Sequence, residues 1–175
     1  PFINFFDGFR TSHEYHKVEV MDQEDIAKLV DPADIKNFRD RALTPERPVT
    51  RGTAENPETF FAHRESCNRY YDAIPGIVEK YMAAISERTG RKYELFSYYG
   101  AEDAEDVIIL MGSATEAARE AIDYANAHGK KYGMVSVHLY RPFSVKHLLK
   151  AVPQSCKRIA VLDRTKEPGS SGEPL

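Results

Sequence analysis

The sequence predicts an α/β protein whose C-terminal half forms an open, mostly parallel sheet built from a βαβαβ unit. Three short apolar runs, at residues 106–112, 134–139 and 157–163, have the length and composition of strands buried on both faces of a sheet. The segments between these runs show helical periodicity. Strands that alternate with helices at this spacing are typical of parallel sheets with right-handed crossovers.

Local signals delimit the two helices of this unit. In the first, Ser113 is expected to be the N-cap, Glu116 its capping-box partner three residues on, and Gly129 the residue that ends the helix. The second is a short helix within residues 144–153 that stops at Pro153.

The N-terminal half reads differently. Residues 1–8, "PFINFFDG", have the aromatic and β-branched content of a buried strand and end in a turn signal. Two short helices are predicted at residues 22–30 and 31–43. The proline-rich residues 44–57 are predicted to be an extended linker. Two apolar helices, 58–74 and 75–90, are then expected to be separated at Pro75–Gly76, with Gly90 as the C-cap of the second.

Composition excludes several classes of function. The chain has 175 residues, is 42% hydrophobic and 29% charged, and carries a net charge of −3 with both signs interspersed. Nucleic-acid binding would require a basic stripe, so none is expected. No apolar stretch has the length of a membrane span and no signal-peptide pattern opens the chain, which favours a cytoplasmic location. Cys67 and Cys156 are far apart and are expected to be reduced packing residues.

Candidate site residues cluster in two places. Near the N-terminus, Arg10, Thr11, Ser12 and His13 are expected to form a turn or an inter-domain contact. The neighbouring "SHEYH" lacks the H-E-x-x-H spacing that places two histidines one helical turn apart, so no metal site is expected.

The second group follows the predicted parallel strands. The carboxyl ends of such strands meet at one edge of the sheet, where ligands and partners bind. That edge would gather Ser113, Arg141, Arg164 and Lys166. Ser113 can cap a helix or hold an anion with the free N–H groups there. Arg141 can form a structural salt bridge or bind a carboxylate or phosphate group. The closing segment "DRTKEPGSSGEPL" can be a solvated charged loop or a surface that contacts a partner. His138 is expected to be a satisfied strand histidine.

The residues alone leave two hypotheses open. One is an α/β domain of a larger protein. The other is a free-standing module that binds a small anionic ligand at the carboxyl edge of its sheet. No nucleophile with an adjacent base, no cluster ligands and no paired carboxylates are recognisable, so no catalytic, cofactor-binding or metal-ligating residue is predicted. Because the chain starts at Pro1 in an apolar run and stops in a loop, we expect it to be an internal piece of a longer polypeptide.

Several stretches taken together resemble pyruvate:ferredoxin (or flavodoxin) oxidoreductase. They are "FFDGFRTSHE", "TRGTAENPE", "PGIVEKYM", "LMGSATEAA", "LYRPF" and "VLDRTKEPG" followed by "SGEPL", and the match runs in order through the whole chain. The resemblance implies that residues 1–50 are the end of a thiamine-enzyme first domain plus the linker. Residues 51–96 would be connecting helices, and residues 97–175 an α/β domain like the C-terminal domain of transketolase that runs into the next domain.

The same resemblance implies the chemistry of the parent enzyme. The family converts pyruvate and coenzyme A to acetyl-CoA and carbon dioxide and passes electrons to ferredoxin or flavodoxin. It uses thiamine diphosphate with Mg²⁺ and [4Fe–4S] clusters. A cluster needs about four thiolates, which two distant cysteines cannot supply. The resemblance also implies that the diphosphate and pyruvate sites lie in segments outside this chain. We therefore expect this chain to bind none of these cofactors, to be inactive alone, and to shape contacts with the remaining domains and across a homodimer.

Overall fold

The computed structural model describes residues 8, 11–49, 52 and 54–175. The chain divides into two compact units, each considered by itself below. One comprises residues 17–91, and the other joins residues 92–175 to residues 1–16. The strand expected at residues 1–7 and the candidate Arg10 lie outside the described residues.

The second of these units contains a four-stranded sheet that confirms the predicted fold class. Its strands are β1 (Phe96–Gly100), β2 (Asp106–Leu110), β3 (Tyr132–Val137) and β4 (Arg158–Val161), in the spatial order β1-β3-β2-β4. The strands predicted within residues 106–112, 134–139 and 157–163 are β2, β3 and β4, and β2 pairs in parallel with both of the others. The sheet is therefore open and mostly parallel.

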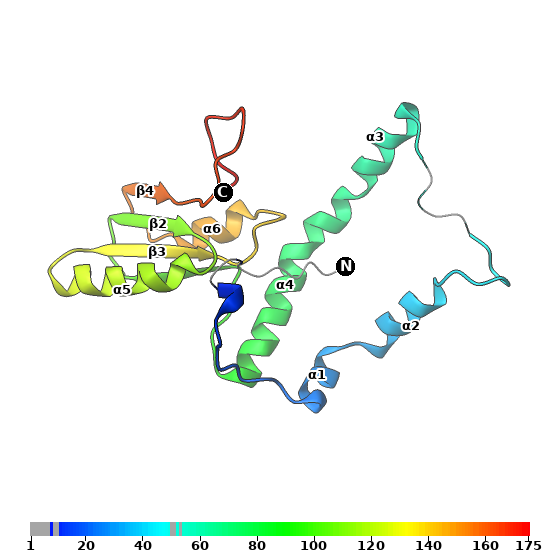
Figure 1. Cartoon of the computed structure of the whole chain (residues 1–175), viewed down its shortest axis with the longest axis horizontal. Helices are drawn as coiled ribbons and strands as arrows, with labels where there is room; N and C mark the ends of the chain where they lie inside the picture. Colours follow the sequence, from blue (N-terminus) through cyan, green and yellow to red (C-terminus); the bar gives the residue numbers. More distant parts are fainter. Residues whose placement is uncertain (1–7, 9–10, 50–51, 53) are drawn as a thin grey trace. The chain divides into compact units, whose positions relative to one another are not determined.

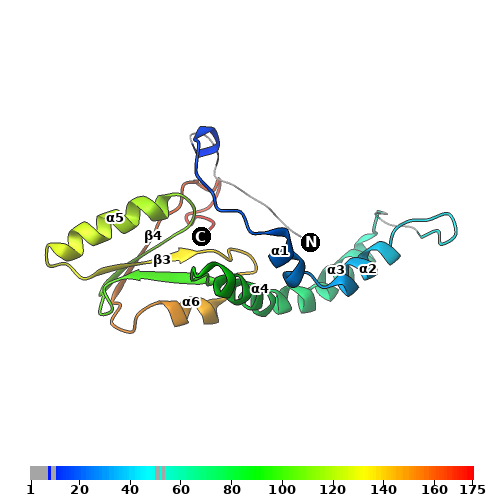
Figure 2. The same cartoon turned by 90° about the horizontal axis from the view of Figure 1, so that it is seen from below.

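Helix α5 (Ala114–Ala127) follows β2, and α6 (Val145–Ala151) follows β3. The two helices lie on opposite faces of the sheet (Figure 2). Ile122 of α5 packs against Leu110 of β2 and Met134 of β3 to form a buried cluster. On the other face Phe96 of β1 meets Phe143, just before α6, in an edge-to-face contact with 5.3 Å between ring centres. The side chains of β2 and β3 are thus buried on both faces of the sheet and form the core of this unit.

Strand β1 was not anticipated. It pairs antiparallel with β3, from Phe96 opposite Val137 to Gly100 opposite Gly133. Two glycines let these strands approach closely. The ring of Tyr98 crosses over Gly133, where a Cβ atom would overlap it. Gly100, at φ +126°, faces the backbone of Tyr132, where a Cβ atom would lie 2.5 Å from the carbonyl oxygen.

The other unit contains four helices among the described residues: α1 (Gln23–Leu29), α2 (Pro32–Asp40), α3 (Pro57–Ser66) and α4 (Asn68–Thr89). They appear in Figure 1 in blue to green. Asp31 caps α2 by accepting a hydrogen bond from the Ala33 N–H at 2.8 Å. Gly90, at φ +69°, ends α4 as predicted.

The predicted break at Pro75–Gly76 is wrong. Helix α4 runs through Pro75, and the separation from α3 falls at Cys67, whose backbone stays in the helical region. A proline inside a helix removes one hydrogen bond. Here the turns on either side of Pro75 remain helical, so the loss of that one bond does not end the helix.

Candidate functional site

The carboxyl edge of the parallel strands brings three segments together, as the sequence predicted. They are the turn from β2 into α5, the residues after β3, and the segment that follows β4. We call this last segment, residues 163–175, the C-terminal loop. It leaves β4 and doubles back next to its own start (Figure 1).

Arg141, just past β3, is held by carbonyl oxygens. Its Nη1 donates to the carbonyl of Tyr140 at 2.9 Å and its Nη2 to the carbonyl of Pro174 at 3.1 Å. The guanidinium carbon lies 3.8 Å from the centre of the Tyr140 ring, a cation–π contact. The Tyr140 hydroxyl donates to the same Pro174 carbonyl at 3.0 Å. Arg141 therefore joins the end of β3 to the end of the C-terminal loop.

Lys166 is also engaged within this unit. Its Nζ forms an ion pair with Glu173 across the C-terminal loop, and the backbone N–H of Glu167 donates to the same carboxylate at 2.6 Å. Arg164 is exposed on the loop. Both lysine and glutamate come from the loop itself, so the ion pair of Lys166 stabilises the loop conformation.

The N-terminus of α5 differs from its prediction. Ser113 is the N-cap residue, but its side chain makes no capping hydrogen bond, so the expected capping box with Glu116 is wrong. Thr115 is the buried residue here, and its hydroxyl donates to the Gly112 carbonyl at 2.8 Å. The Ser113 backbone is already helical, with φ −63° and ψ −22°, whereas a capping serine normally has extended backbone angles.

The N-terminal candidates are placed only in part. Residues Thr11–His13 form a short 3₁₀ turn. The Ser12 hydroxyl and the Nδ1 of His13 lie 3.1 Å apart. The turn predicted for this stretch is present, and its role as an inter-domain contact stays a prediction.

His138 lies just past β3, and its backbone N–H donates to the Leu95 carbonyl at 3.0 Å. Although part of the residue is exposed, packing around the ring lowers the pKa of His138, and the positive charge of Arg119 lowers it further. Glu94 acts in the opposite direction. Arg119 itself stacks on Tyr99, with its guanidinium 4.8 Å from the ring centre.

This lowered pKa predicts a dependence of stability on pH. An unfolded histidine takes up a proton near pH 6.5, but folded His138 does so only at lower pH. The contribution of neutral His138 is therefore complete above about pH 6.5 and is lost as the pH falls through the folded pKa. Replacing His138 by glutamine should flatten the fall in melting temperature between about pH 7 and pH 5.

The pKa can be read directly from the ring protons of His138 by NMR. Replacing Arg119 by glutamine should move this pKa upward, toward its ordinary value, because one positive charge is removed. A folded chain in which His138 titrates at or above about pH 6.5 would contradict the lowered pKa of this residue.

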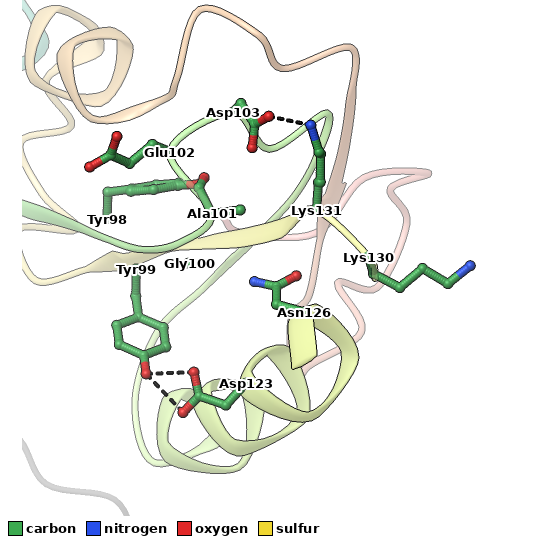
Figure 3. Close-up of a pocket in the computed structure, with 10 residues that line it drawn as sticks. All are labelled: Tyr98, Tyr99, Gly100, Ala101, Glu102, Asp103, Asp123, Asn126, Lys130 and Lys131. Atoms are coloured by element: carbon green, nitrogen blue, oxygen red, sulfur yellow. Dashed lines mark hydrogen bonds and ion pairs between the residues drawn. The ribbon is translucent and has the colours of Figure 1, made fainter. Parts of the chain in front are cut away.

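A hollow lies at the opposite edge of the sheet, where β1 ends and β3 begins (Figure 3). Its volume is about 630 Å³, and none of its residues was anticipated as a site. The Tyr99 hydroxyl donates to both oxygens of Asp123, at 2.7 and 2.8 Å, which raises the pKa of Tyr99. Asn126 donates to the Tyr132 carbonyl at 3.0 Å and accepts from its N–H at 2.8 Å.

Of the other four charged groups around this hollow, two are paired with each other and two are exposed. Asp103 forms an ion pair with Lys131, which lowers the pKa of the carboxyl group. Glu102 and Lys130 extend from the rim as exposed arms (Figure 3). Because most polar groups of the hollow bind one another, its contacts join α5 to the sheet.

No three His, Cys, Asp or Glu side chains in the described part of the chain gather closely enough to hold a metal ion. Both cysteines, which lie in described segments, are free thiols. No helix in the described ranges is long and apolar enough to cross a bilayer.

Comparison with known proteins identifies two parts along the chain. Residues 1–83 match the family model described as "Pyruvate flavodoxin/ferredoxin oxidoreductase, thiamine diP-bdg". Residues 104–175 match that of "Pyruvate:ferredoxin oxidoreductase core domain II". The chain thus combines sequence of a thiamine diphosphate-binding domain with sequence of a core α/β domain.

Relatives match over the whole chain. A pyruvate-flavodoxin oxidoreductase of Enterobacter agglomerans is 59% identical over 175 residues, and a pyruvate:ferredoxin oxidoreductase of Moorella thermoacetica is 57% identical over the same length. The match takes in 100% of this chain and 15% of each relative. A Nostoc pyruvate-flavodoxin oxidoreductase is 52% identical over 174 residues, which is 99% of this chain and 14% of the relative. The chain belongs to the pyruvate:flavodoxin/ferredoxin oxidoreductase family.

Proposed function

We propose that this chain serves as part of an enzyme that converts pyruvate and coenzyme A to acetyl-CoA and carbon dioxide and passes the electrons to flavodoxin or ferredoxin. The proposal rests on sequence identity of 49–59% along the entire chain with relatives named as pyruvate oxidoreductases that use flavodoxin or ferredoxin. Thiamine diphosphate would stabilise the carbanion that decarboxylation of pyruvate produces. Its Mg²⁺ and the [4Fe–4S] clusters would be held by other segments of the polypeptide.

Within that enzyme, the role proposed for this chain is structural. The helices α1 to α4 contain no buried residue among those described. Large apolar side chains along them are exposed, for example Phe61 at 72% and Tyr70 at 62%. Most of the stability of a helix in a protein comes from packing of its apolar side chains. These helices therefore suit a position against other parts of the polypeptide or against the second subunit of a homodimer.

The α/β unit has a related feature at its edge. Ile159, Val161 and Leu162, in and just after β4, are about half exposed, at 52%, 52% and 51%. An exposed apolar edge strand is a surface that native proteins normally cover. Together with exposed Arg164, this edge supports a role for the α/β unit in contacts between domains. Boundaries at residues 50 and 96, a homodimer and a cytoplasmic location belong to the same proposal.

The alternative, a free-standing module for a small anion, has less support. Its best candidate ligand, Arg141, already donates to two carbonyls and stacks on Tyr140. These contacts leave fewer of its five N–H groups to bind an anion.

The parent activity can be tested with the whole polypeptide. Purified under anaerobic conditions, it should reduce flavodoxin or ferredoxin only when both pyruvate and coenzyme A are present. Substituting 2-oxoglutarate for pyruvate tests the choice of substrate. Equal or faster turnover with 2-oxoglutarate would contradict the proposed substrate, and the absence of any acyl-CoA product would contradict the proposed reaction.

A further inference from the structure

The C-terminal loop is closed on itself by two sets of contacts. At its base, the backbone N–H of Leu175 donates to the carboxylate of Asp163 at 2.7 Å. Further along, the carboxylate of Glu173 accepts the N–H of Glu167 and pairs with Lys166. Each carboxylate thus joins the outgoing half of the loop to the returning half. A charged acceptor makes such a backbone hydrogen bond stronger than a neutral one would.

The closed loop also contacts residues that follow a strand other than β4. It starts after β4, whereas its Pro174 carbonyl is bound by Tyr140 and Arg141, which follow β3. Strand β2 lies between β3 and β4 in the sheet. The connection therefore passes over the carboxyl end of β2.

The Pro174 carbonyl is well placed for this attachment. It accepts from a neutral hydroxyl at 3.0 Å and from a guanidinium at 3.1 Å. The guanidinium is itself fixed in place, because it stacks on the Tyr140 ring and also donates to the Tyr140 carbonyl. Pro174 and Leu175 are accordingly half-buried, while most of the loop before them is exposed.

From this geometry we propose that residues 163–175 form a strap across the carboxyl edge of the sheet, and that Tyr140 and Arg141 are the clamp that holds it closed. In open α/β sheets this edge is where ligands bind. The strap covers the end of β2 as long as the clamp holds. Access to that edge is therefore controlled by two side chains outside the loop. This inference does not depend on the proposed enzymatic function.

Amide hydrogen exchange followed by NMR on the 175-residue chain tests the strap. In the unaltered chain the amides of Glu167 and Leu175 should exchange slowly, because they donate to carboxylates. Replacing Tyr140 by phenylalanine and Arg141 by alanine together should speed their exchange by about tenfold or more. Amides of β2 and β3 should keep their protection.

Arg158→Ala is the matched control. It removes an arginine that pairs with Asp106 at the opposite end of the same strands, with Nη2 to Oδ2 at 2.8 Å. Exchange in the C-terminal loop should stay unchanged in this variant. Unprotected loop amides in the unaltered chain, or equal exchange in the clamp variant, would overturn the proposal. If the double variant loses the protection of β2 and β3, Tyr140→Phe alone decides: it removes one oxygen and should still speed loop exchange.

Discussion

Replacing Gly100 by alanine is expected to destabilise the α/β unit by about 3 kcal/mol. This is near the upper end of the cost of one strained backbone position. Two causes add at this position. The residue has φ +126°, a conformation that side chains with a Cβ atom rarely adopt, and the new methyl group would lie 2.5 Å from the Tyr132 carbonyl oxygen and 2.7 Å from the Gly133 Cα. Both neighbours are backbone atoms of β3, so β1 would have to separate from that strand. Thermal unfolding should show a drop of more than about 10 °C.

Gly129→Ala separates the two causes. Gly129 also has positive φ, at +82°, but no atom lies within 4 Å of a Cβ atom built there. Only the backbone strain remains, which costs about 1 kcal/mol. If both variants melted at the same temperature, the close approach of β1 to β3 would be contradicted.

The parallel part of this sheet could be predicted because its strands carry their own signal. Short apolar runs rich in β-branched residues, such as "DVIIL", indicate buried strands, and the amphipathic helix between two of them sets the connection. Strand β1 lacked such a signal. Its sequence "FSYYG" follows a charged stretch, and its strand conformation depends on pairing with β3, which lies more than thirty residues further along the chain.

Helix boundaries were less predictable where two local effects compete. Pro75–Gly76 is a strong signal for a break, yet α4 continues through it. In contrast, Gly90 was correctly predicted to end α4, since its positive φ is needed there whatever surrounds it.

The candidate site was predicted in position more than in contacts. Sequence reasoning placed Arg141, Arg164 and Lys166 at one edge of the sheet because each follows a predicted parallel strand. The partners of Arg141 and Lys166, namely Pro174 and Glu173, could not be predicted, because an irregular loop has no repeating geometry from which to derive neighbours. Tyr140 was missed for the same reason.

The expected inability of this chain to bind thiamine diphosphate tests the central claim most directly. The role proposed for this chain in a thiamine-dependent enzyme is structural, and its described residues hold no cluster of metal-ligating side chains. Calorimetric titration with thiamine diphosphate and Mg²⁺ should show Kd weaker than about 1 mM for the 175-residue chain, whereas the whole polypeptide should bind at least about a hundredfold more tightly. Micromolar binding by the 175-residue chain alone would contradict the claim.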